Sequence, residues 1–254
     1  MRLVIKIGTS TLVHSNGKPN IRHLERLCRV VADLKNAGHE LDLVSSGAIA
    51  MGMGKLGLKF RPEDMPGKQA TAAVGQCELM YAYDKLFSEY NHTVAQILIT
   101  GDDFEEANRR FNFRNTVFRL LESGVLPIVN ENDTVSTDEI SVGDNDTLAA
   151  LVSKSVQAEL LVLLSDIDGL YTSDPSEDSN AQLISEVTEL SGGIIAAAGG
   201  SGKLGTGGME TKLKAAAICM ENGIDMVIAN GGNPDLLYGI LENKKIGTRF
   251  IASK

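Results

Sequence analysis

The stretch LVIKIG, residues 3–8, decides the fold class because a short apolar run, typical of a buried strand, leads directly into a glycine. Similar, mostly apolar runs recur at residues 41–44, 94–99, 125–129, 160–164 and 226–229. Longer segments with helical character lie between the runs, at residues 21–34, 70–89, 110–122, 147–156 and 209–222. Strands that alternate with helices in this way predict an α/β fold with a mostly parallel sheet covered by helices on both faces.

Polar and glycine-rich segments follow four of these strands: Gly8 to Ser10, Ser45 to Gly47, Asn130 to Asp133, and Ser165 with Asp166. In an open α/β sheet, ligands bind beyond the carboxyl ends of the strands. We therefore expect the four segments to form one composite site at that edge of the sheet. Any one of them alone could be an ordinary turn.

The composition is that of a globular protein with room for one large domain or two small ones. The chain has 254 residues, of which 43% are hydrophobic and 22% are charged. The formal net charge is −9 and no run of clustered Lys and Arg occurs, which argues against a nucleic-acid partner. A few local cations could still bind a small anion.

The chain shows no signal for a membrane or for secretion. No apolar run approaches the ~18 residues of a membrane-spanning helix, and the start, MRLVIKIGTS, lacks the pattern of a signal peptide. We therefore expect a cytoplasmic protein without a membrane partner. Cys28, Cys77 and Cys219 lack CxxC spacing and are interpreted as reduced thiols in the core. The four histidines show no ligand spacing, so no metal site made by the protein is predicted.

Two lysines stand where a cation is unexpected. Lys6 lies inside the first strand, where an unpaired buried ammonium is costly. Lys212 falls in the first turn of the helix predicted from Met209, at the positive end of its dipole, which costs about 0.3–1 kcal/mol. An anion bound near each lysine would remove the conflict. The alternative for Lys6 is an edge strand from which the side chain reaches solvent.

The glycine run GSGKLGTGG, residues 200–208, precedes that helix. Free backbone amides at such a helix start suit a phosphate, with Lys212 behind them. The spacing Gly200-x-Gly202-x-x-Gly205 also matches a nicotinamide dinucleotide fingerprint, but that motif should follow a clear strand and open a helix directly. A G-x4-G-K-[ST] phosphate loop does not occur. The run is therefore interpreted as a phosphate-binding nest.

Acidic and amide side chains gather in VGDND, residues 142–146, and in NENDTV, residues 130–135. Asp144 or Asn145 could simply cap the helix that follows, and NENDTV could be a polar turn. Three such residues in VGDND exceed the needs of one cap. Asp146 is therefore predicted to pair with the lysines and to hold them on a phosphoryl group.

Seven motifs occur in a fixed order along nearly the whole chain: VIKIGTS, VSSGAIAMG, GKQATAAVGQ, VNENDTV, VGDND, DIDGLYTSDP and GTGGMETK. In this order they resemble the glutamate 5-kinase branch of the amino-acid kinase superfamily. GLYTSDP and GTGGM-x-TK are shared across the superfamily, whereas SSGAIAMG, NEND and GDND point to this branch.

The resemblance implies a three-layer αβα sandwich around a mostly parallel sheet. It implies a single kinase domain over residues 1–254, with an N-terminal part that mainly binds the acceptor and a C-terminal part that mainly binds ATP. Many members carry a further C-terminal PUA domain, and this chain resembles the short form without it.

The resemblance also implies roles for individual residues. Lys6 and Lys212 would stabilise the transferring phosphoryl group, and Asp146 would organise both lysines. The acceptor-binding positions are Ser46, Gly47, Asp133 and Asn145. The ATP-binding positions are Lys6, Gly8, Ser165, Asp166, Thr206, Gly207, Gly208, Met209, Glu210, Thr211 and Lys212.

The implied reaction is the ATP-dependent phosphorylation of the side-chain carboxylate of L-glutamate to L-glutamyl 5-phosphate, the first step of proline biosynthesis. Mg²⁺ would be held mainly by the ATP phosphates. A carboxylate nucleophile with a pKa near ~4.3 is already ionised, so the site needs lysines and amides but no general base. The family also implies proline as a feedback inhibitor, glutamyl phosphate reductase as a metabolic partner, and a homo-oligomer, either a tetramer or a dimer.

Two alternatives stay open. Another kinase of the superfamily would act on N-acetylglutamate, aspartate, carbamate or UMP. A catalytically silent nucleotide-binding protein on the same fold is disfavoured because Lys6, Asp146 and Lys212 are all present.

Overall fold

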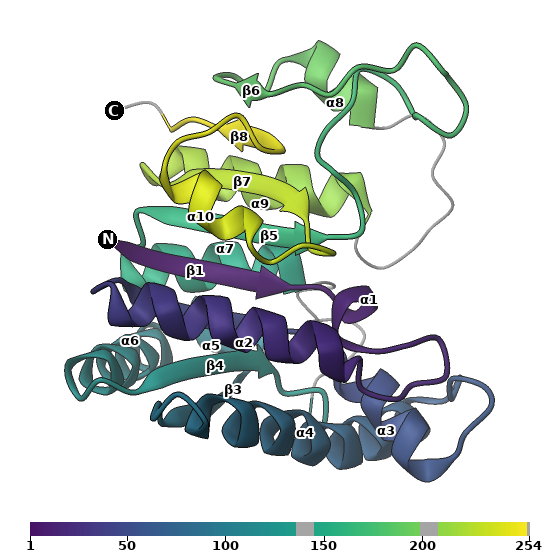
Figure 1. The fold of residues 1–254 in the computed structure, drawn as a ribbon, viewed down its shortest axis with the longest axis vertical. Helices are drawn as coiled ribbons and strands as arrows, with labels where there is room; N and C mark the ends of the chain where they lie inside the picture. The colour runs from purple at the N-terminus through teal and green to yellow at the C-terminus, as the bar shows by residue number, and fades with distance from the viewer. Residues whose placement is uncertain (136–144, 199–207, 253–254) are drawn as a thin grey trace.

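The computed structural model describes residues 1–135, 145–198 and 208–252, and its centre is an eight-stranded sheet. The strands are β1 (Arg2–Ile7), β2 (Glu40–Ser45), β3 (Val94–Ile99), β4 (Leu126–Glu131), β5 (Leu160–Ser165), β6 (Glu186–Val187), β7 (Asp225–Asn230) and β8 (Thr248–Phe250). Their order is β3-β4-β2-β1-β5-β7-β8-β6, as Figure 1 shows. Neighbouring strands are parallel except for β7 and β8. The prediction of a mostly parallel sheet is confirmed.

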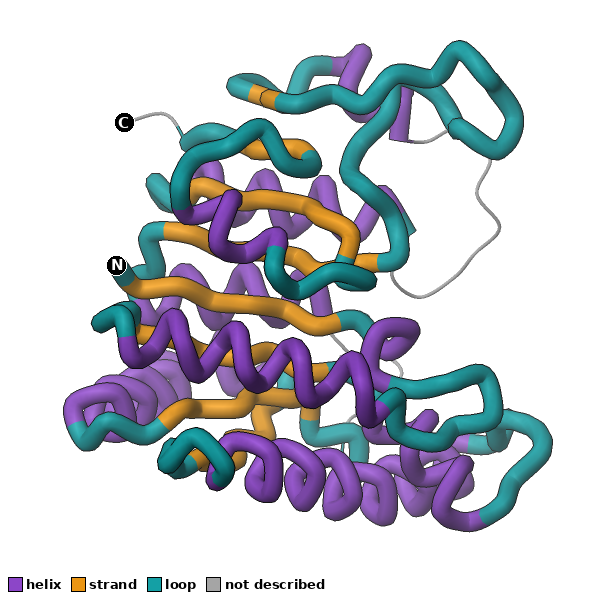
Figure 2. Tube along the Cα trace, in the orientation of Figure 1, coloured by secondary structure: helices purple, strands orange, loops and turns teal. Residues whose placement is uncertain are grey.

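Helices cover both faces of this sheet (Figure 2). One face packs against α2 (Ile21–Asn36), α4 (Met65–Ser88) and α10 (Leu236–Leu241). The other packs against α6 (Ala107–Glu122), α7 (Asn145–Val156) and α9 (Met209–Glu221). The shorter helices are α1 (Thr9–Leu12), α3 (Ala48–Leu56), α5 (Gly101–Glu105) and α8 (Gly192–Ala198). The three-layer αβα arrangement is therefore confirmed.

Side-chain alternation in β1 decides which residues face which layer. Leu3, Ile5 and Ile7 belong to the core beneath α2, whereas Val4 belongs to the core beneath α7 and α9. Because successive side chains of a strand point to opposite faces, Lys6 lies on the same side as Val4. The only charged residue of the LVIKIG stretch thus faces α7 and α9.

The glycine-rich helix α3 was not predicted, because its sequence AIAMGMGKL has poor helical propensity. Packing against α4 stabilises it instead. A Cβ added at Gly75 would overlap the Ala48 carbonyl oxygen, and one added at Gly52 would overlap the Thr71 carbonyl oxygen. Glycine at these positions lets the two helix backbones touch. The residue before α3, Gly47, has φ of 95°, which also favours glycine.

Two further expectations needed correction. The helix predicted at residues 70–89 begins earlier, at Met65, where Asp64 caps it and a proline occupies the first turn. Cys28 and Cys219 are buried as expected, but Cys77 is exposed on α4, so its assignment to the core was wrong.

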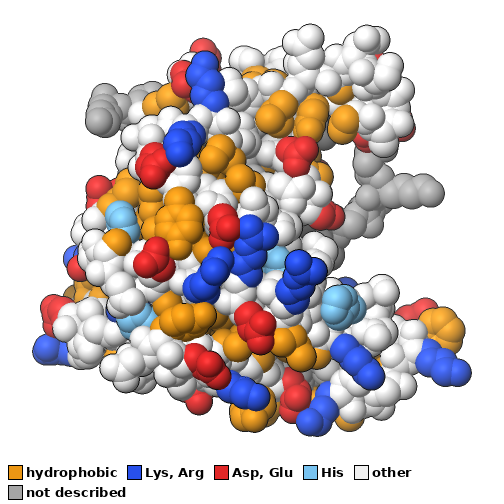
Figure 3. Space-filling view, viewed as in Figure 1, with side chains coloured by type: hydrophobic (Ala, Val, Ile, Leu, Met, Phe, Trp, Pro, Cys, Tyr) orange, Lys and Arg blue, Asp and Glu red, His pale blue; other side chains and the backbone are white. Residues whose placement is uncertain are grey.

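The surface carries charges of both signs close together. Figure 3 shows Lys and Arg side chains interspersed with Asp and Glu over the face that α2 covers. Arg26 of α2, for example, forms an ion pair with Asp235. None of the helices within the described residues is long and apolar enough to span a membrane.

Candidate active site

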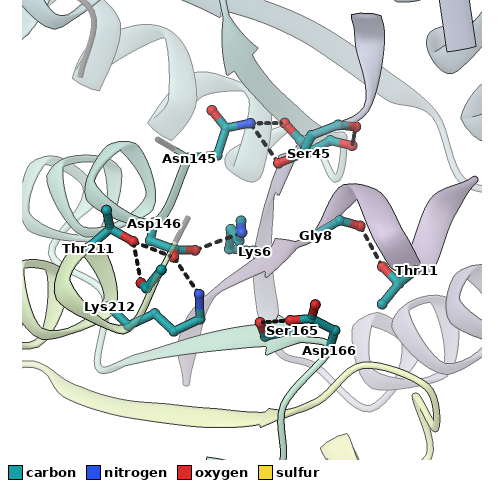
Figure 4. Close-up of polar contacts among 12 residues, drawn as sticks. Lys6, Gly8, Thr11, Ser45, Asn145, Asp146, Ser165, Asp166, Thr211 and Lys212 are labelled. Atoms are coloured by element: carbon teal, nitrogen blue, oxygen red, sulfur yellow. Dashed lines mark hydrogen bonds and ion pairs between the residues drawn. The ribbon is translucent and has the colours of Figure 1, made fainter. Parts of the chain in front are cut away.

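The carboxyl ends of four strands meet at one edge of the sheet, and Figure 4 shows polar side chains that gather there. The Gly8 amide after β1 donates to the Leu164 carbonyl of β5 at 3.1 Å. The Ser46 amide after β2 donates to the Ile7 carbonyl of β1 at 3.2 Å. The side chain of Asn145 joins the ends of β2 and β4. The expectation that the four polar segments meet is therefore confirmed.

Two buried lysines flank one buried carboxylate, and we call Lys6, Asp146 and Lys212 the lysine cluster. Lys6 Nζ lies 2.7 Å from Asp146 Oδ1, and Lys212 Nζ lies 3.0 Å from Asp146 Oδ2. The three residues are 8%, 1% and 3% exposed, respectively. Because β1 lies between β2 and β5, Lys6 is not on an edge strand, and that alternative is wrong. The predicted pairing of Asp146 with both lysines is confirmed.

Helix geometry explains why the cluster forms. Asp146 lies in the first turn of α7, where the helix dipole favours an anion. Lys212 lies near the start of α9, where the dipole disfavours a cation, and Asp146 compensates for that conflict. The Thr211 hydroxyl lies 3.2 Å from Asp146 Oδ2 and 2.7 Å from the Gly208 carbonyl. Each charge is therefore held by a partner from a different element.

Charge pairing also decides the ionisation state of the carboxylate. Burial alone would raise the pKa of Asp146, but the ammonium groups of Lys6 and Lys212 outweigh burial and hold the pKa below its usual value. Asp146 is thus a carboxylate at neutral pH, and it fixes the positions of two ammonium groups.

Gly8 leaves space beside Lys6. A Cβ added at Gly8 would lie 4.0 Å from Lys6 Nζ and 3.3 Å from the Leu164 carbonyl oxygen. A side chain here would occupy the space next to the ammonium group. The glycine and the two lysines therefore fit the terminal phosphates of a nucleotide, which carry negative charge and need close approach to the backbone.

A second cluster is uncharged, and we call Gln76, Asn130, Asn145 and Ser46 the amide network. Asn145 Nδ2 lies 2.8 Å from Ser46 Oγ and 3.2 Å from Asn130 Oδ1. Asn130 Nδ2 donates to Gln76 Oε1 at 2.8 Å. Sequence reasoning singled out Asn145 and Ser46 but missed Gln76. The only available signal was its place at the end of the motif GKQATAAVGQ.

Residues 130–135, which we call the polar turn, contain a carboxyl group of a different kind. Burial and the nearby charge of Glu131 raise the pKa of Asp133 to about 6, although Arg61 acts in the opposite direction. Among the described residues, Asp133 has no hydrogen-bond or ion-pair partner. Within the described part of the chain, its charge is thus not directly paired.

The remaining predicted ATP-binding residues are only partly brought together. Ser165 is buried at the end of β5 and donates to the exposed Asp166 at 3.0 Å. Glu210 is exposed and pairs with Lys214 at 3.0 Å. Gly208 directly precedes α9, which begins at the partly exposed Met209.

Several predictions concern residues outside the described ranges. Thr206 and Gly207, the rest of the glycine run at 200–205, and Asp144 belong to this group. The element before the glycine run is helix α8, not a strand. This placement argues against the nicotinamide fingerprint, which requires a strand at that point.

Metal ligands do not gather in the part of the chain that the structure describes. No group of three or more His, Cys, Asp or Glu side chains there is arranged to hold a metal ion. A divalent cation at this site would need other ligands, such as phosphate oxygens and water.

Comparisons with known proteins agree with this geometry. The model of the amino acid kinase family matches residues 1–230. A glutamate 5-kinase from Clostridium perfringens is 52% identical over 258 residues, which cover 100% of this chain and 96% of the relative. One from Clostridium acetobutylicum is 54% identical over 251 residues, covering 98% of this chain and 94% of the relative.

A solved structure supports the fold. Carbamate kinase from Giardia lamblia, bound to AMP-PNP, matches with a TM-score of 0.68 and 16% identity, covering 99% of this chain and 98% of its own. At that identity the likeness concerns the fold alone. Together with the family match over most of the chain and relatives at about half identity, the buried lysine cluster shows that this chain belongs to the amino acid kinase family.

Proposed function

We propose that this protein transfers the γ-phosphoryl group of ATP to the side-chain carboxylate of L-glutamate, forming L-glutamyl 5-phosphate and ADP. The observation that carries the proposal is the lysine cluster, in which one buried carboxylate fixes two ammonium groups and that of Lys6 lies beside Gly8. The choice of glutamate rests on the full-length relatives that bear the name glutamate 5-kinase.

The chemistry needs no proton transfer. An oxygen of the glutamate carboxylate forms a bond to the γ-phosphorus. The bond between that phosphorus and the bridging oxygen breaks, and its electron pair leaves with ADP. Because the carboxylate is already ionised near neutral pH, no general base is needed. The main barrier is the repulsion between two anions and the charge that spreads over the phosphoryl oxygens.

The lysine cluster suits this barrier. Lys6 and Lys212 approach from β1 and α9, and Asp146 holds both ammonium groups before substrate arrives. Cations that are already in place stabilise developing charge without reorganisation during the reaction. Mg²⁺ bound to the ATP phosphates would neutralise part of their charge. We expect phosphate oxygens and water to supply most of its ligands.

The acceptor would bind at the amide network and the polar turn. Free glutamate carries an α-ammonium group, which can form a charge-assisted hydrogen bond with Asp133. Asn145 and Ser46 would hold another part of the acceptor, with the backbone of Gly47 next to them. The N-terminal part of the chain would thus mainly bind the acceptor, and Ser165, Asp166 and the start of α9 would contact ATP.

The wider biology follows from the product. An acyl phosphate is reactive, so a reductase that consumes it is the expected metabolic partner. Proline, the end product of the pathway, is the expected feedback inhibitor. Assembly into a tetramer or a dimer is part of the same proposal.

A direct assay tests the proposal. The protein is incubated with ATP, Mg²⁺ and one acceptor at a time: L-glutamate, N-acetylglutamate, aspartate, carbamate or UMP. Hydroxylamine traps acyl phosphates as hydroxamates, and ADP release reports the other acceptors. Hydroxamate from L-glutamate, with little turnover of the others, is the expected result. A better alternative acceptor, or no turnover despite ATP binding, would overturn the proposal.

A further inference from the structure

We propose that Gln76 is a positioning residue for the acceptor side of the site, because it orients the amide of Asn145 through Asn130. The inference rests on the proposed function, since it concerns how the acceptor is held. Within the described residues, no hydrogen bond or ion pair joins Gln76 to the lysine cluster or to a residue predicted to bind ATP. Its effect should therefore fall on acceptor binding alone.

Gln76 lies inside the protein and forms a hydrogen bond with a residue near the end of strand β4. It is 9% exposed on α4, and its Oε1 accepts a hydrogen bond of 2.8 Å from Asn130 Nδ2. Asn130 is 2% exposed near the carboxyl end of β4. The contact thus joins α4 to the strand end from which the polar turn begins.

The direction of each amide in the network is determined by its neighbours. Asn130 Oδ1 accepts from the backbone amide of Glu131 at 2.9 Å and from Asn145 Nδ2 at 3.2 Å. Two donors at this atom require an oxygen there, so the nitrogen of Asn130 must point to Gln76. Gln76 in turn must present its oxygen. One backbone amide therefore sets the orientation of all three side chains.

The consequence is an acceptor on Asn145 that no described residue engages. Its Nδ2 also lies 2.8 Å from the Ser45 carbonyl and 2.8 Å from Ser46 Oγ, so the nitrogen is engaged by the protein. Figure 4 shows the oxygen of Asn145 on the side away from Ser45. Among the described residues, nothing donates to this oxygen. Like the carboxylate of Asp133, it offers an acceptor to a ligand that carries N–H donors.

The two ends of the Gln76 amide differ. Its Nε2 is buried and has no hydrogen-bond partner within the described residues, which is destabilising. Its Oε1 satisfies the buried amide of Asn130. The oxygen that Gln76 supplies to Asn130 is the feature that an apolar side chain lacks.

The adjacent residue fixes α4 on the same side of the site. Gly75 lets α4 touch the Ala48 carbonyl in the first turn of α3, directly after the turn formed by Ser46 and Gly47. Residues 75 and 76 thus connect α4 to α3, which follows Ser46 and Gly47, and to β4, which carries Asn130. The orientation of Gln76 is consequently well defined.

Two substitutions separate the hydrogen bond from the volume of the side chain. Gln76→Met has similar volume but no oxygen, whereas Gln76→Glu keeps an oxygen that Asn130 can donate to. If the hydrogen bond matters, Gln76→Met should raise the KM for L-glutamate roughly tenfold, with the KM for ATP unchanged and Gln76→Glu closer to wild type. If only packing matters, the order is reversed, because Glu would place a charge in the interior.

A second measurement does not depend on the identity of the acceptor. In protein labelled with ¹⁵N-asparagine, hydrogen exchange of the side-chain amides of Asn130 and Asn145 is compared between wild type and Gln76→Met. We expect exchange to accelerate roughly tenfold or more in the variant. Ser153→Ala is the matched control, because it removes a buried hydrogen bond to Ala149 within α7 without touching the network.

The outcomes distinguish the two proposals. If wild type does not phosphorylate L-glutamate, the proposed function fails, and the exchange measurement alone decides the role of Gln76. Unchanged exchange in Gln76→Met, or an effect no larger than that of Ser153→Ala, overturns the inference. A wild-type KM for L-glutamate in Gln76→Met overturns it as well, if wild type uses that acceptor.

Discussion

The lysine cluster contains a buried acid and the polar turn contains a half-buried one, and the protein treats the two acids in opposite ways. Asp146 is paired with two lysines, and these charges outweigh burial and lower its pKa. Burial dominates at Asp133 and raises its pKa to about 6. One carboxylate is thus stabilised by two lysines of the chain, whereas the other has no ion-pair partner among the described residues, and a cationic ligand would supply one.

This contrast separates two ways of preparing a site. A preassembled group of charges is suited to stabilising a transition state, because it need not reorganise during the reaction. An uncompensated acid is suited to discrimination, because the wrong ligand leaves it unpaired. On this basis, changes in the lysine cluster should lower turnover, and changes in the polar turn should alter the choice of acceptor.

The largest effect is expected for Lys212→Met. Removing one of two fixed cations should lower kcat by roughly 10²–10³, while the fold persists because Lys6 still pairs with Asp146. Steady-state turnover and a melting curve measure the two parts of this prediction.

Lys214→Met is the matched control, because Lys214 lies on the same helix, is exposed and pairs only with Glu210 among the described residues. It should behave like wild type. Turnover of Lys212→Met within about threefold of the control would rule out the catalytic role of Lys212.

Asp146→Asn is the second test, with an expected loss of roughly 10² in kcat. The neutral amide cannot hold two ammonium groups in place, so transfer should suffer more than ATP binding. The dissociation constant of ATP, measured by calorimetry, should change only a few-fold. A large rise in that constant with turnover preserved would show that Asp146 acts on nucleotide binding instead.

Much of the lysine cluster could be predicted from the sequence, because both lysines occupy positions that local preferences for strands and helices disfavour. A lysine in an apolar strand and a lysine at a helix start each conflict with local preference, and VGDND supplied the acid. Three-dimensional proximity then followed from the rule that parallel strands end at one edge. The alternation of strands and helices could also be predicted, because it depends on local sequence patterns.

The amide network could not be predicted in this way. Gln76 and Asn130 are 54 residues apart, and neither conflicts with its local surroundings. The raised pKa of Asp133 depends mainly on its burial, which the residue pattern of the turn does not reveal. Helix α3 was missed because its stability comes from contact with α4 and not from its own residues.

The third prediction tests selectivity, with a smaller effect. Wild type should prefer L-glutamate over N-acetylglutamate by roughly 10³ in kcat/KM, because the acetylated amine cannot neutralise Asp133. Asp133→Asn should reduce that preference roughly tenfold or more. Equal use of both acceptors by wild type, or an unchanged ratio in the variant, would contradict the assignment.

The last prediction asks whether a raised pKa by itself marks a binding group, and it concerns Asp42. This residue lies in the middle of β2, is fully buried, and has no hydrogen-bond partner for either oxygen among the described residues. Burial raises its pKa to about 7, with Arg2 opposing and Glu40 reinforcing the shift. Asp42 thus resembles Asp133 electrostatically but lies away from the site.

The sign of the effect on stability follows from proton linkage. The folded state holds the Asp42 proton more tightly than the unfolded state does, so the free energy of unfolding should fall as pH rises from about 4 to about 7. Asp42→Asn has no such proton. Between about pH 5 and pH 8, wild type should therefore lose roughly 2 kcal/mol relative to the variant. Urea denaturation at several pH values measures this difference in slope.

Activity measurements provide the decisive control, because the two variants Asp42→Asn and Asp133→Asn should affect activity differently. Asp42→Asn should change stability with pH but leave kcat/KM for L-glutamate and the preference over N-acetylglutamate as in wild type. Asp133→Asn should change that preference. The stability linked to the Asp133 proton in wild type should be lost as pH rises to about 6, which is lower than for Asp42. If Asp42→Asn also altered acceptor choice, burial alone would explain the behaviour of Asp133, and the contrast between the two regions would lose its functional meaning. If its stability slope matched wild type, Asp42 would not be the group whose ionisation is linked to folding in this pH range.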